Sequence, residues 1–204
     1  QVIHIDPAAV SATGNALDNF LRGNSFHNIL TGGAGDDTLD GGNLFYTTSI
    51  QPLNDDILIG GSGNDTYYYN ANLGGISTII DQSSPGESNT LRFDNLQGQN
   101  PLNAIHLRLD GTVLSIVMDA GLDSVGEHTR EVRFPDFNPN DAYGLLAIDI
   151  FDFDNGNPLS YQQIIDLGID VQGTSQDDIL GTNVANRFHG GAGNDMLIGN
   201  LRND

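Results

Sequence analysis

A nine-residue pattern, Gly-Gly-x-Gly-x-Asp-x-apolar-x, constrains the fold of this chain more than any other feature. Close copies occupy 32–40, 60–68 and 190–198. Degenerate copies in the same frame begin at further glycines: Gly14, Gly23, Gly41, Gly173 and Gly181. A short period repeated in phase predicts a solenoid, in which each repeat supplies one turn and one short strand and two repeats complete one coil.

The residues of the pattern predict what the turns and strands do. Glycines at positions 1, 2 and 4 allow a tight turn with backbone angles that other residues avoid. Such a turn directs carbonyl oxygens inward, and the Asp at position 6 adds a carboxylate. Oxygen ligands of both kinds suit Ca²⁺, which takes roughly six to eight of them. Each ion would lie between the turn of one repeat and that of the repeat two further on.

The strand positions predict the core and the turn positions predict the metal ligands. The apolar residue at position 8 should point into the coil, which selects Leu21, Leu30, Leu39, Leu58 and Tyr67. The candidate metal-site residues are Gly32, Gly33, Gly35, Asp37, Asp56, Gly60, Gly61, Gly63, Asp65, Asp178, Gly190, Gly191, Gly193 and Asp195.

Some repeats depart from the pattern. Asn replaces Asp at position 6 in the repeats that contain Asn19, Asn28 and Asn186, and 41–50 has no position-6 acid. We expect no strong calcium site beside those residues. The span 41–59 is about two repeats long, so it is either one imperfect coil or one repeat that carries a loop.

Residues 69–170 lack the period and alternate apolar and polar residues, as half-buried antiparallel strands do. Asp110-Gly111 predicts a two-residue hairpin. Ser160 begins a capping box that predicts a short helix over 161–167, with Gly168 as its C-cap. We therefore predict an all-β chain with a strand or linker at 1–13, parallel β-roll arrays at 14–68 and 171–204, and an antiparallel segment with one short helix at 69–170.

Composition supports a calcium-binding chain and excludes several partners. Of the 27 acidic residues 24 are Asp, there is no Lys, and the net charge is −20. This charge disfavours nucleic acid and anionic membranes as direct partners. No signal peptide or run of 18 apolar residues is visible. The chain has no Cys, which excludes disulfides and thiolate metal sites. We expect a monomer.

The repeats resemble those of the RTX (repeats-in-toxin) family. The segments LRLDGTVLSIVM and IDIFDFDNGNPLS between the arrays are similar to the haemolysin-type calcium-binding-related segment of large bacterial proteins exported by type I secretion. The resemblance implies that such flanks cap the β-roll and nucleate its folding. It also implies calcium-driven folding outside the cell, and a role for this chain as a piece of a larger secreted toxin or adhesin, with the rest of that polypeptide as its partner.

Catalytic motifs are missing from the sequence. Neither His-Glu-x-x-His nor Gly-x-Ser-x-Gly occurs, so we predict no enzyme activity. Asp149, Asp152 and Asp154 lack the spacing of an EF-hand loop, and we interpret them as strand alternation into a turn. Two alternatives remain: an adhesion or carbohydrate-binding module that uses the middle sheet to recognise a glycan or host surface, and a non-catalytic module of a secreted polysaccharide-modifying enzyme.

Overall fold

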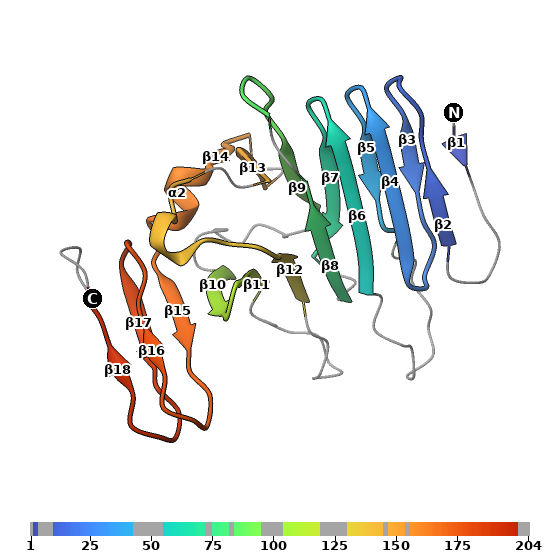
Figure 1. Cartoon of the computed structure of the whole chain (residues 1–204). Helices are drawn as coiled ribbons and strands as arrows, with labels where there is room; N and C mark the ends of the chain where they lie inside the picture. Colours follow the sequence, from blue (N-terminus) through green and yellow to red (C-terminus); the bar gives the residue numbers. More distant parts are fainter. Residues whose placement is uncertain are drawn as a thin grey trace.

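A computed structural model describes residues 2–3, 10–42, 55–71, 75–81, 84–94, 104–118, 130–144, 147–153 and 156–199. In these ranges the chain is all-β, with one short α-helix, α2 (Tyr161–Ile165), and one 3₁₀ turn, η1 (Pro139–Asp141). The predicted fold class is confirmed. In Figure 1 the first array stacks on the right and the second array lies on the left, with the middle segment between them.

A parallel roll contains the first array and extends past it at both ends, and its strands alternate between two sheets. One sheet contains β2 (Val10–Thr13), β4 (Asn28–Ala34), β6 (Asp55–Ser62) and β8 (Gly75–Ile80). The other contains β1 (Val2–Ile3), β3 (Phe20–Arg22), β5 (Thr38–Asp40), β7 (Thr66–Asn70) and β9 (Thr90–Asp94). Phe20 pairs with Thr38, so one coil spans two nine-residue repeats.

The position-8 side chains fill the space between the two sheets as predicted. Their exposed fractions are at most 1 % for the five residues selected from the pattern: Leu21, Leu30, Leu39, Leu58 and Tyr67. Full burial of a Leu contributes about 1.5–3 kcal/mol, so this column is the main apolar support of the roll.

The register resolves the two alternatives for the span 41–59. Ser11 pairs with Ile29, 18 residues away, whereas Ile29 pairs with Ile57, 28 residues away. Among the described residues, one strand, β6, lies between β5 and β7 in the chain. The span is therefore one repeat with a ten-residue insertion, and residues 43–54 within it lie outside the described ranges.

The middle segment extends both sheets of the roll. The sheet of β8 continues into β12 (Arg130–Phe134), β11 (Val113–Met118) and β10 (Ile105–Asp110). The sheet of β9 continues into β13 (Ile150–Asp152) and β14 (Leu159–Ser160). The boundary predicted at 68/69 is thus a change of sequence pattern within continuous sheets.

Strand direction in the middle segment is mixed, which corrects the purely antiparallel expectation. The described antiparallel pairs are β10–β11, β11–β12 and β13–β14, whereas β8–β12, β9–β13 and β10–β15 (Ile169–Gln172) are parallel. Apolar alternation reports half-burial of a strand and carries no information on the direction of its neighbour. The predicted hairpin is present, with Asp110 paired to Val113.

The predicted helix forms where its capping residues place it. Ser160 accepts a hydrogen bond from the Gln163 backbone while the Gln163 side chain binds the Ser160 backbone, so the capping box is complete. Ile164 and Ile165 are buried. The helix ends at Ile165 and its C-cap is Asp166, so it is two residues shorter than predicted and Gly168 is not its cap. Gly168 follows with a φ of 84°, a backbone angle that favours glycine.

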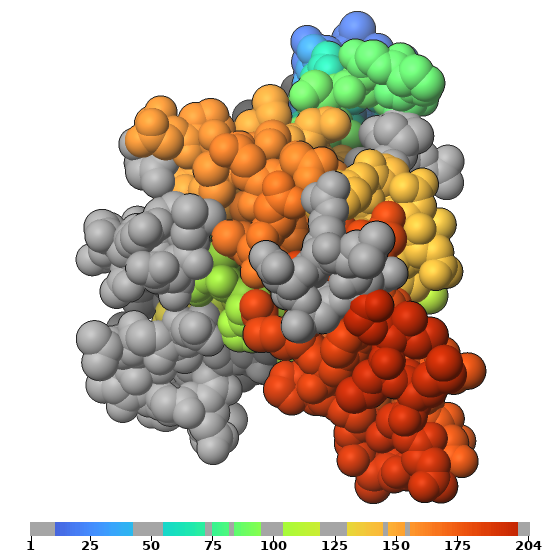
Figure 2. Space-filling model, turned by 90° about the vertical axis from the view of Figure 1, so that its left-hand side faces the viewer, coloured from blue at the N-terminus to red at the C-terminus, as the bar shows by residue number. Residues whose placement is uncertain are grey.

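The second array is less covered than the first. β17 (Asn186–His189) joins the large sheet beside β15, and β16 (Ile179–Leu180) pairs with β18 (Met196–Leu197). Leu197 occupies position 8 but is 49 % exposed. In Figure 2 this array, in red, stands out from the orange and yellow middle segment.

Candidate metal centres

The position-6 residues of the first array form a ladder along one edge of the roll. Each backbone N–H donates to the position-6 side chain of the next coil. Asn19 N donates to Asp37 Oδ1 at 2.7 Å, Asp37 N to Asp65 Oδ1 at 2.8 Å, and Asp65 N to Asn89 Oδ1 at 2.7 Å. Asn89 N then donates to Asp149 Oδ2 at 2.9 Å. The ladder therefore passes from the repeats into the middle segment.

Two further pairs repeat this geometry elsewhere. At the opposite edge of the roll, Asn28 N donates to Asp56 Oδ1 at 2.9 Å. In the second array, Asp178 N donates to Asp195 Oδ1 at 3.1 Å. The five predicted acids thus fall into three groups: Asp37 with Asp65, Asp56 beside Asn28, and Asp178 with Asp195.

The second carboxylate oxygen of the first-array acids is buried without a hydrogen-bond partner. This holds within the described residues for Oδ2 of Asp37, Asp56 and Asp65, and each residue is only 1 % exposed. Burial raises the pKa of the Asp56 carboxyl to about 7 and that of Asp65 to about 6, and it also raises the pKa of Asp37. A buried oxygen of this kind requires a cation or a proton.

These oxygens point at the position-1 glycine of their own repeat. A Cβ on Gly32 would overlap Asp37 Oδ2 and lie 2.7 Å from the carbonyl oxygen of Gly60 in the next coil. A Cβ on Gly41 would likewise overlap Asp56 Oδ2. The space beside Gly32 is therefore lined by a carboxylate oxygen and a carbonyl oxygen, as a hard cation needs.

The glycines of the turn have two different physical roles, which corrects the single role expected. Positions 2 and 4 have positive φ, for example 114° at Gly61 and 125° at Gly63, and both lie against the backbone of the preceding coil. The position-1 glycines Gly32, Gly60 and Gly190 lack positive φ. They are small because the position-6 carboxylate occupies the space of their side chain.

Asn at position 6 satisfies the same turn without a charge. Asn28 Nδ2 donates to the carbonyl oxygen of Gly41 at 3.0 Å and to that of Asn24 at 3.1 Å. The amide therefore supplies the donors that a carboxylate lacks, and its turn requires no cation.

The second array presents its acids in a more open setting. Asp178 Oδ2 accepts from Thr174 N at 2.7 Å and from Thr174 Oγ1 at 3.0 Å. Gly191 and Gly193 have φ values of 89° and 125°, as the first-array turns do, and a Cβ on Gly190 would lie 2.6 Å from Asp195 Oδ2. The backbone geometry of the turns is the same in the two arrays, but both acids of the second array are only partly buried.

Four polar residues at the end of the first roll were not selected from the sequence. Asn89 and Asp149 extend the ladder, Asp81 accepts from the Tyr67 hydroxyl at 2.6 Å, and Glu87 accepts from Gly63 N at 3.0 Å. They stand outside the nonapeptide frame, because the coil from Thr66 to Thr90 has 24 residues. Asp81, Asn89 and Asp149 directly follow or precede an apolar strand, which is the signal that could have found them.

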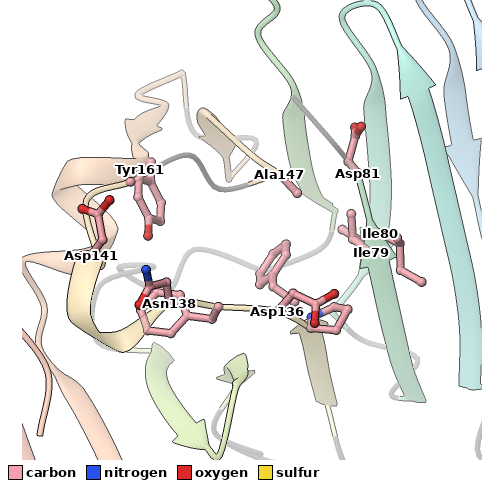
Figure 3. A pocket seen from close by; sticks show the side chains of 12 residues that line it. Ile79, Ile80, Asp81, Asp136, Asn138, Asp141, Ala147 and Tyr161 are labelled. Atoms are coloured by element: carbon pink, nitrogen blue, oxygen red, sulfur yellow. The ribbon is translucent and has the colours of Figure 1, made fainter. Parts of the chain in front are cut away.

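Two cavities adjoin these elements. A polar cavity of about 70 Å³ lies beside Asp56, lined also by Asp40, Asp94 and Ser77. A larger cavity of about 320 Å³ lies between the end of β8, residues 134–144, Ala147 and α2 (Figure 3). Its polar lining includes Asp136, Asn138, Asp141 and Tyr161.

The donor set favours hard cations. Within the described ranges no group of three or more His, Cys, Asp or Glu is arranged to hold a metal, so a cation here must draw on backbone carbonyls as well as carboxylates. Mixed carbonyl and carboxylate coordination in a flexible loop is typical of Ca²⁺ and unlike the nitrogen and sulfur ligands of Zn²⁺.

Comparison with known proteins identifies the repeats. The family of the RTX calcium-binding nonapeptide repeat matches four copies, over residues 13–43, 54–71 and 171–204. No curated protein matches the chain. None of the described helices has the length and apolar character needed to span a membrane. The chain therefore carries an RTX calcium-binding β-roll region.

Proposed function

We propose that this RTX calcium-binding region folds around several Ca²⁺ ions that are held between successive turns. The carboxylates of Asp37, Asp56, Asp65, Asp178 and Asp195 would be the charged ligands, and the glycine turns that precede them would supply carbonyls. The unpartnered, buried Oδ2 atoms of Asp37, Asp56 and Asp65 carry this proposal. All three are buried carboxylates in a chain with a net charge of −20, so their ionised form needs a counter-ion.

Calcium binding at these sites would decide whether the chain is folded. Extracellular modules bind Ca²⁺ with a Kd of roughly 10⁻⁴ to 10⁻³ M. At ~1 mM Ca²⁺, a site with a Kd of ~0.1 mM stabilises the folded state by about 1.4 kcal/mol. Five such sites would contribute ~7 kcal/mol, which is comparable to the whole stability of a domain. At the ~10⁻⁷ M Ca²⁺ of a cytosol the same relation gives almost nothing.

This difference supports a role in protein export. RTX repeats are typical of secreted bacterial proteins. We infer a non-catalytic module of a larger toxin or adhesin that leaves the cell by type I secretion in a loose state. Calcium outside the cell then orders the turns, and the folded roll opposes return through the channel.

The test is a Ca²⁺ titration followed by far-UV circular dichroism, with Mg²⁺ as the control ion. We expect a cooperative gain of β signal at sub-millimolar to millimolar Ca²⁺ and little change with Mg²⁺, which dehydrates reluctantly and prefers octahedral geometry. A spectrum that is folded at the start and unmoved by Ca²⁺ or by chelator would contradict the proposal.

A glycan-binding role is the second candidate, and the larger cavity favours it. The cavity combines carboxylate and amide groups at Asp136, Asn138 and Asp141 with the ring of Tyr161 (Figure 3). Convergent polar groups in an apolar concavity are typical of small-ligand sites. A glycan array probed in the presence of Ca²⁺ tests this role, and binding that is lost in Asn138→Ala would support it. Failure to bind any glycan would contradict it.

A further inference from the structure

Asp81 occupies a special position at the end of the first roll. Ile80 of β8 pairs with Ile59 of β6, so Asp81 stands in register with Gly60, the position-1 glycine of the preceding coil. The repeat match ends at residue 71, which leaves Asp81 outside the repeats. A carboxylate therefore stands where the next RTX turn would begin.

The Asp81 carboxylate lies beside the turn of the last repeat of the first array. We call the space beside a position-1 glycine, here Gly60, the cradle of its repeat. Its Oδ2 accepts from the Tyr67 hydroxyl at 2.6 Å and from Asn89 Nδ2 at 2.8 Å. A Cβ on Gly60 would overlap Asp65 Oδ2 and the Tyr67 hydroxyl and would lie 2.8 Å from Asp81 Oδ2. In Figure 3 the Asp81 side chain points away from Asp136 and Asn138. Asp81 lines the cavity, and its carboxylate contacts Tyr67 and Asn89 of the roll.

This cradle differs from the preceding one in charge. Asp37 Oδ2 faces the carbonyl oxygen of Gly60, whereas Asp65 Oδ2 faces the carboxylate of Asp81. Two carboxylates that share a buried site cannot both remain ionised without a counter-charge. Asp65 is 1 % exposed and its Oδ2 has no hydrogen-bond partner among the described residues, so a ligand for that atom is still required.

The loop 84–89 closes this cradle from the outer side. Gly63 N donates to Glu87 Oε1 at 3.0 Å, Ser88 N donates to Asn64 Oδ1 at 2.8 Å, and Asp65 N donates to Asn89 Oδ1 at 2.7 Å. The loop therefore lies on the last RTX turn as a following coil would, although it has no glycine pattern.

We propose that Asp65 and Asp81 together hold one Ca²⁺ ion between the last repeat of the first array and the loop 84–89, an inference that rests on the proposed calcium function. This site has two carboxylates, so it binds calcium more tightly than the one-carboxylate cradle at Asp37, because affinity rises with ligand charge. The ion ties the middle segment to the roll, so the end of the array is completed by a residue outside the repeats.

The test uses the full chain and Tb³⁺ as a luminescent substitute for Ca²⁺. The chain has six Tyr and no Trp, and the Tyr67 hydroxyl touches Asp81, so an ion here should be excited through the Tyr67 ring. We expect Tyr-sensitised Tb³⁺ emission that Ca²⁺ displaces. In Asp81→Asn, which keeps an oxygen for both hydrogen bonds, we expect this emission to fall and the affinity for one ion to drop about tenfold or more.

Two further variants keep the result interpretable. Asp136→Asn removes an exposed charge from the neighbouring cavity and should change neither quantity. Tyr67→Phe keeps both carboxylates, so it should keep the calcium stoichiometry but lose emission, which also decides the matter if Asp81→Asn does not fold. Unchanged emission and ion count in Asp81→Asn, or full emission in Tyr67→Phe, would overturn the site while leaving calcium-driven folding intact. No calcium response in the wild type would remove the proposed function itself.

Discussion

Replacing Asp56 by Asn should stabilise the metal-free protein and weaken its response to calcium. Asp56 is 1 % exposed, its Oδ1 accepts from Asn28 N and Nδ2 at 2.9 and 2.8 Å, and its Oδ2 has no partner among the described residues. Asn keeps the first oxygen and replaces the second by a donor, as Asn28 shows one coil earlier. The exchange therefore removes a buried charge and keeps the hydrogen bonds.

The magnitude follows from the pKa of Asp56. Burial and the charges of Asp40 and Asp55 raise this pKa, while the hydrogen bonds from Asn28 lower it. The result is a rise from 3.8 to about 7. Each pKa unit corresponds to 1.36 kcal/mol, so the ionised carboxylate costs the folded state about 4 kcal/mol. The folded state holds its proton more tightly than the unfolded state, so metal-free stability falls as the pH rises from about 4 to about 7. The gain from Asn should be about 4 kcal/mol at pH 8 and near zero at pH 4.

Urea unfolding followed by circular dichroism in metal-depleted buffer measures this gain. Where the wild type is largely unfolded in that buffer, the same free energy is measured by folding it with increasing TMAO. Asp55→Asn is the matched control, because it removes the same charge from an exposed residue of the same strand. In saturating Ca²⁺ the advantage of Asp56→Asn should vanish or reverse. A variant that is less stable than the wild type at pH 8 without calcium, or a gain that is equal at pH 4 and pH 8, would refute the reasoning.

Three other variants test the turns, the core and the large sheet, each by urea unfolding in Ca²⁺. Gly61→Ala should lower the free energy of unfolding by about 3 kcal/mol or more, because φ is 114° and the new Cβ would overlap the Gly33 carbonyl oxygen. Gly86→Ala, where φ is 99° and the new Cβ meets open space, should lower it by only about 1–2 kcal/mol. Equal losses in the two variants would contradict the steric argument. Leu39→Ala should cost about 2–5 kcal/mol, since Leu39 is fully buried, and a loss below 1 kcal/mol would mean that the two sheets are not packed through position 8. Glu131→Gln should cost about 3–5 kcal/mol. Burial alone would raise the pKa of Glu131, but hydrogen bonds from arginine and serine side chains and nearby arginine charges hold it below its usual range. The wild type should therefore lose stability as the pH falls through this pKa, and the Gln variant should not show that loss. An equal loss of stability at acid pH in both proteins would contradict this.

The repeats made most of the first array predictable from sequence. Each nonapeptide combines a glycine turn with an apolar position 8, and both features are local, so period alone gives the parallel coils and the buried column from Leu21 to Tyr67. The same locality identified the position-6 acids. It did not reveal why position 1 is glycine, because the atom that excludes a side chain there belongs to the Asp five residues later.

The middle segment was less predictable because its pairing is long-range. β8 and β9 continue the roll although their coil has no acid at the place of position 6. Ser77 pairs with Asp56 there, and Asn89 accepts the ladder hydrogen bond from Asp65 N. No glycine pattern marks that coil, so only the three-dimensional register relates Asp81 to Gly60. The direction of β12 and β13 likewise depends on neighbours more than 50 residues away in the chain.

One comparison tests the central claim, that buried unpartnered carboxylates make folding depend on calcium. The wild type and a variant with Asn at all five acid positions (Asp37, Asp56, Asp65, Asp178 and Asp195) are titrated with Ca²⁺ while the β signal is recorded. We predict that the wild type gains its β structure only as Ca²⁺ is added, whereas the variant is already folded in chelator and does not respond. A variant that remains unfolded without calcium and still folds when calcium is added would contradict the account.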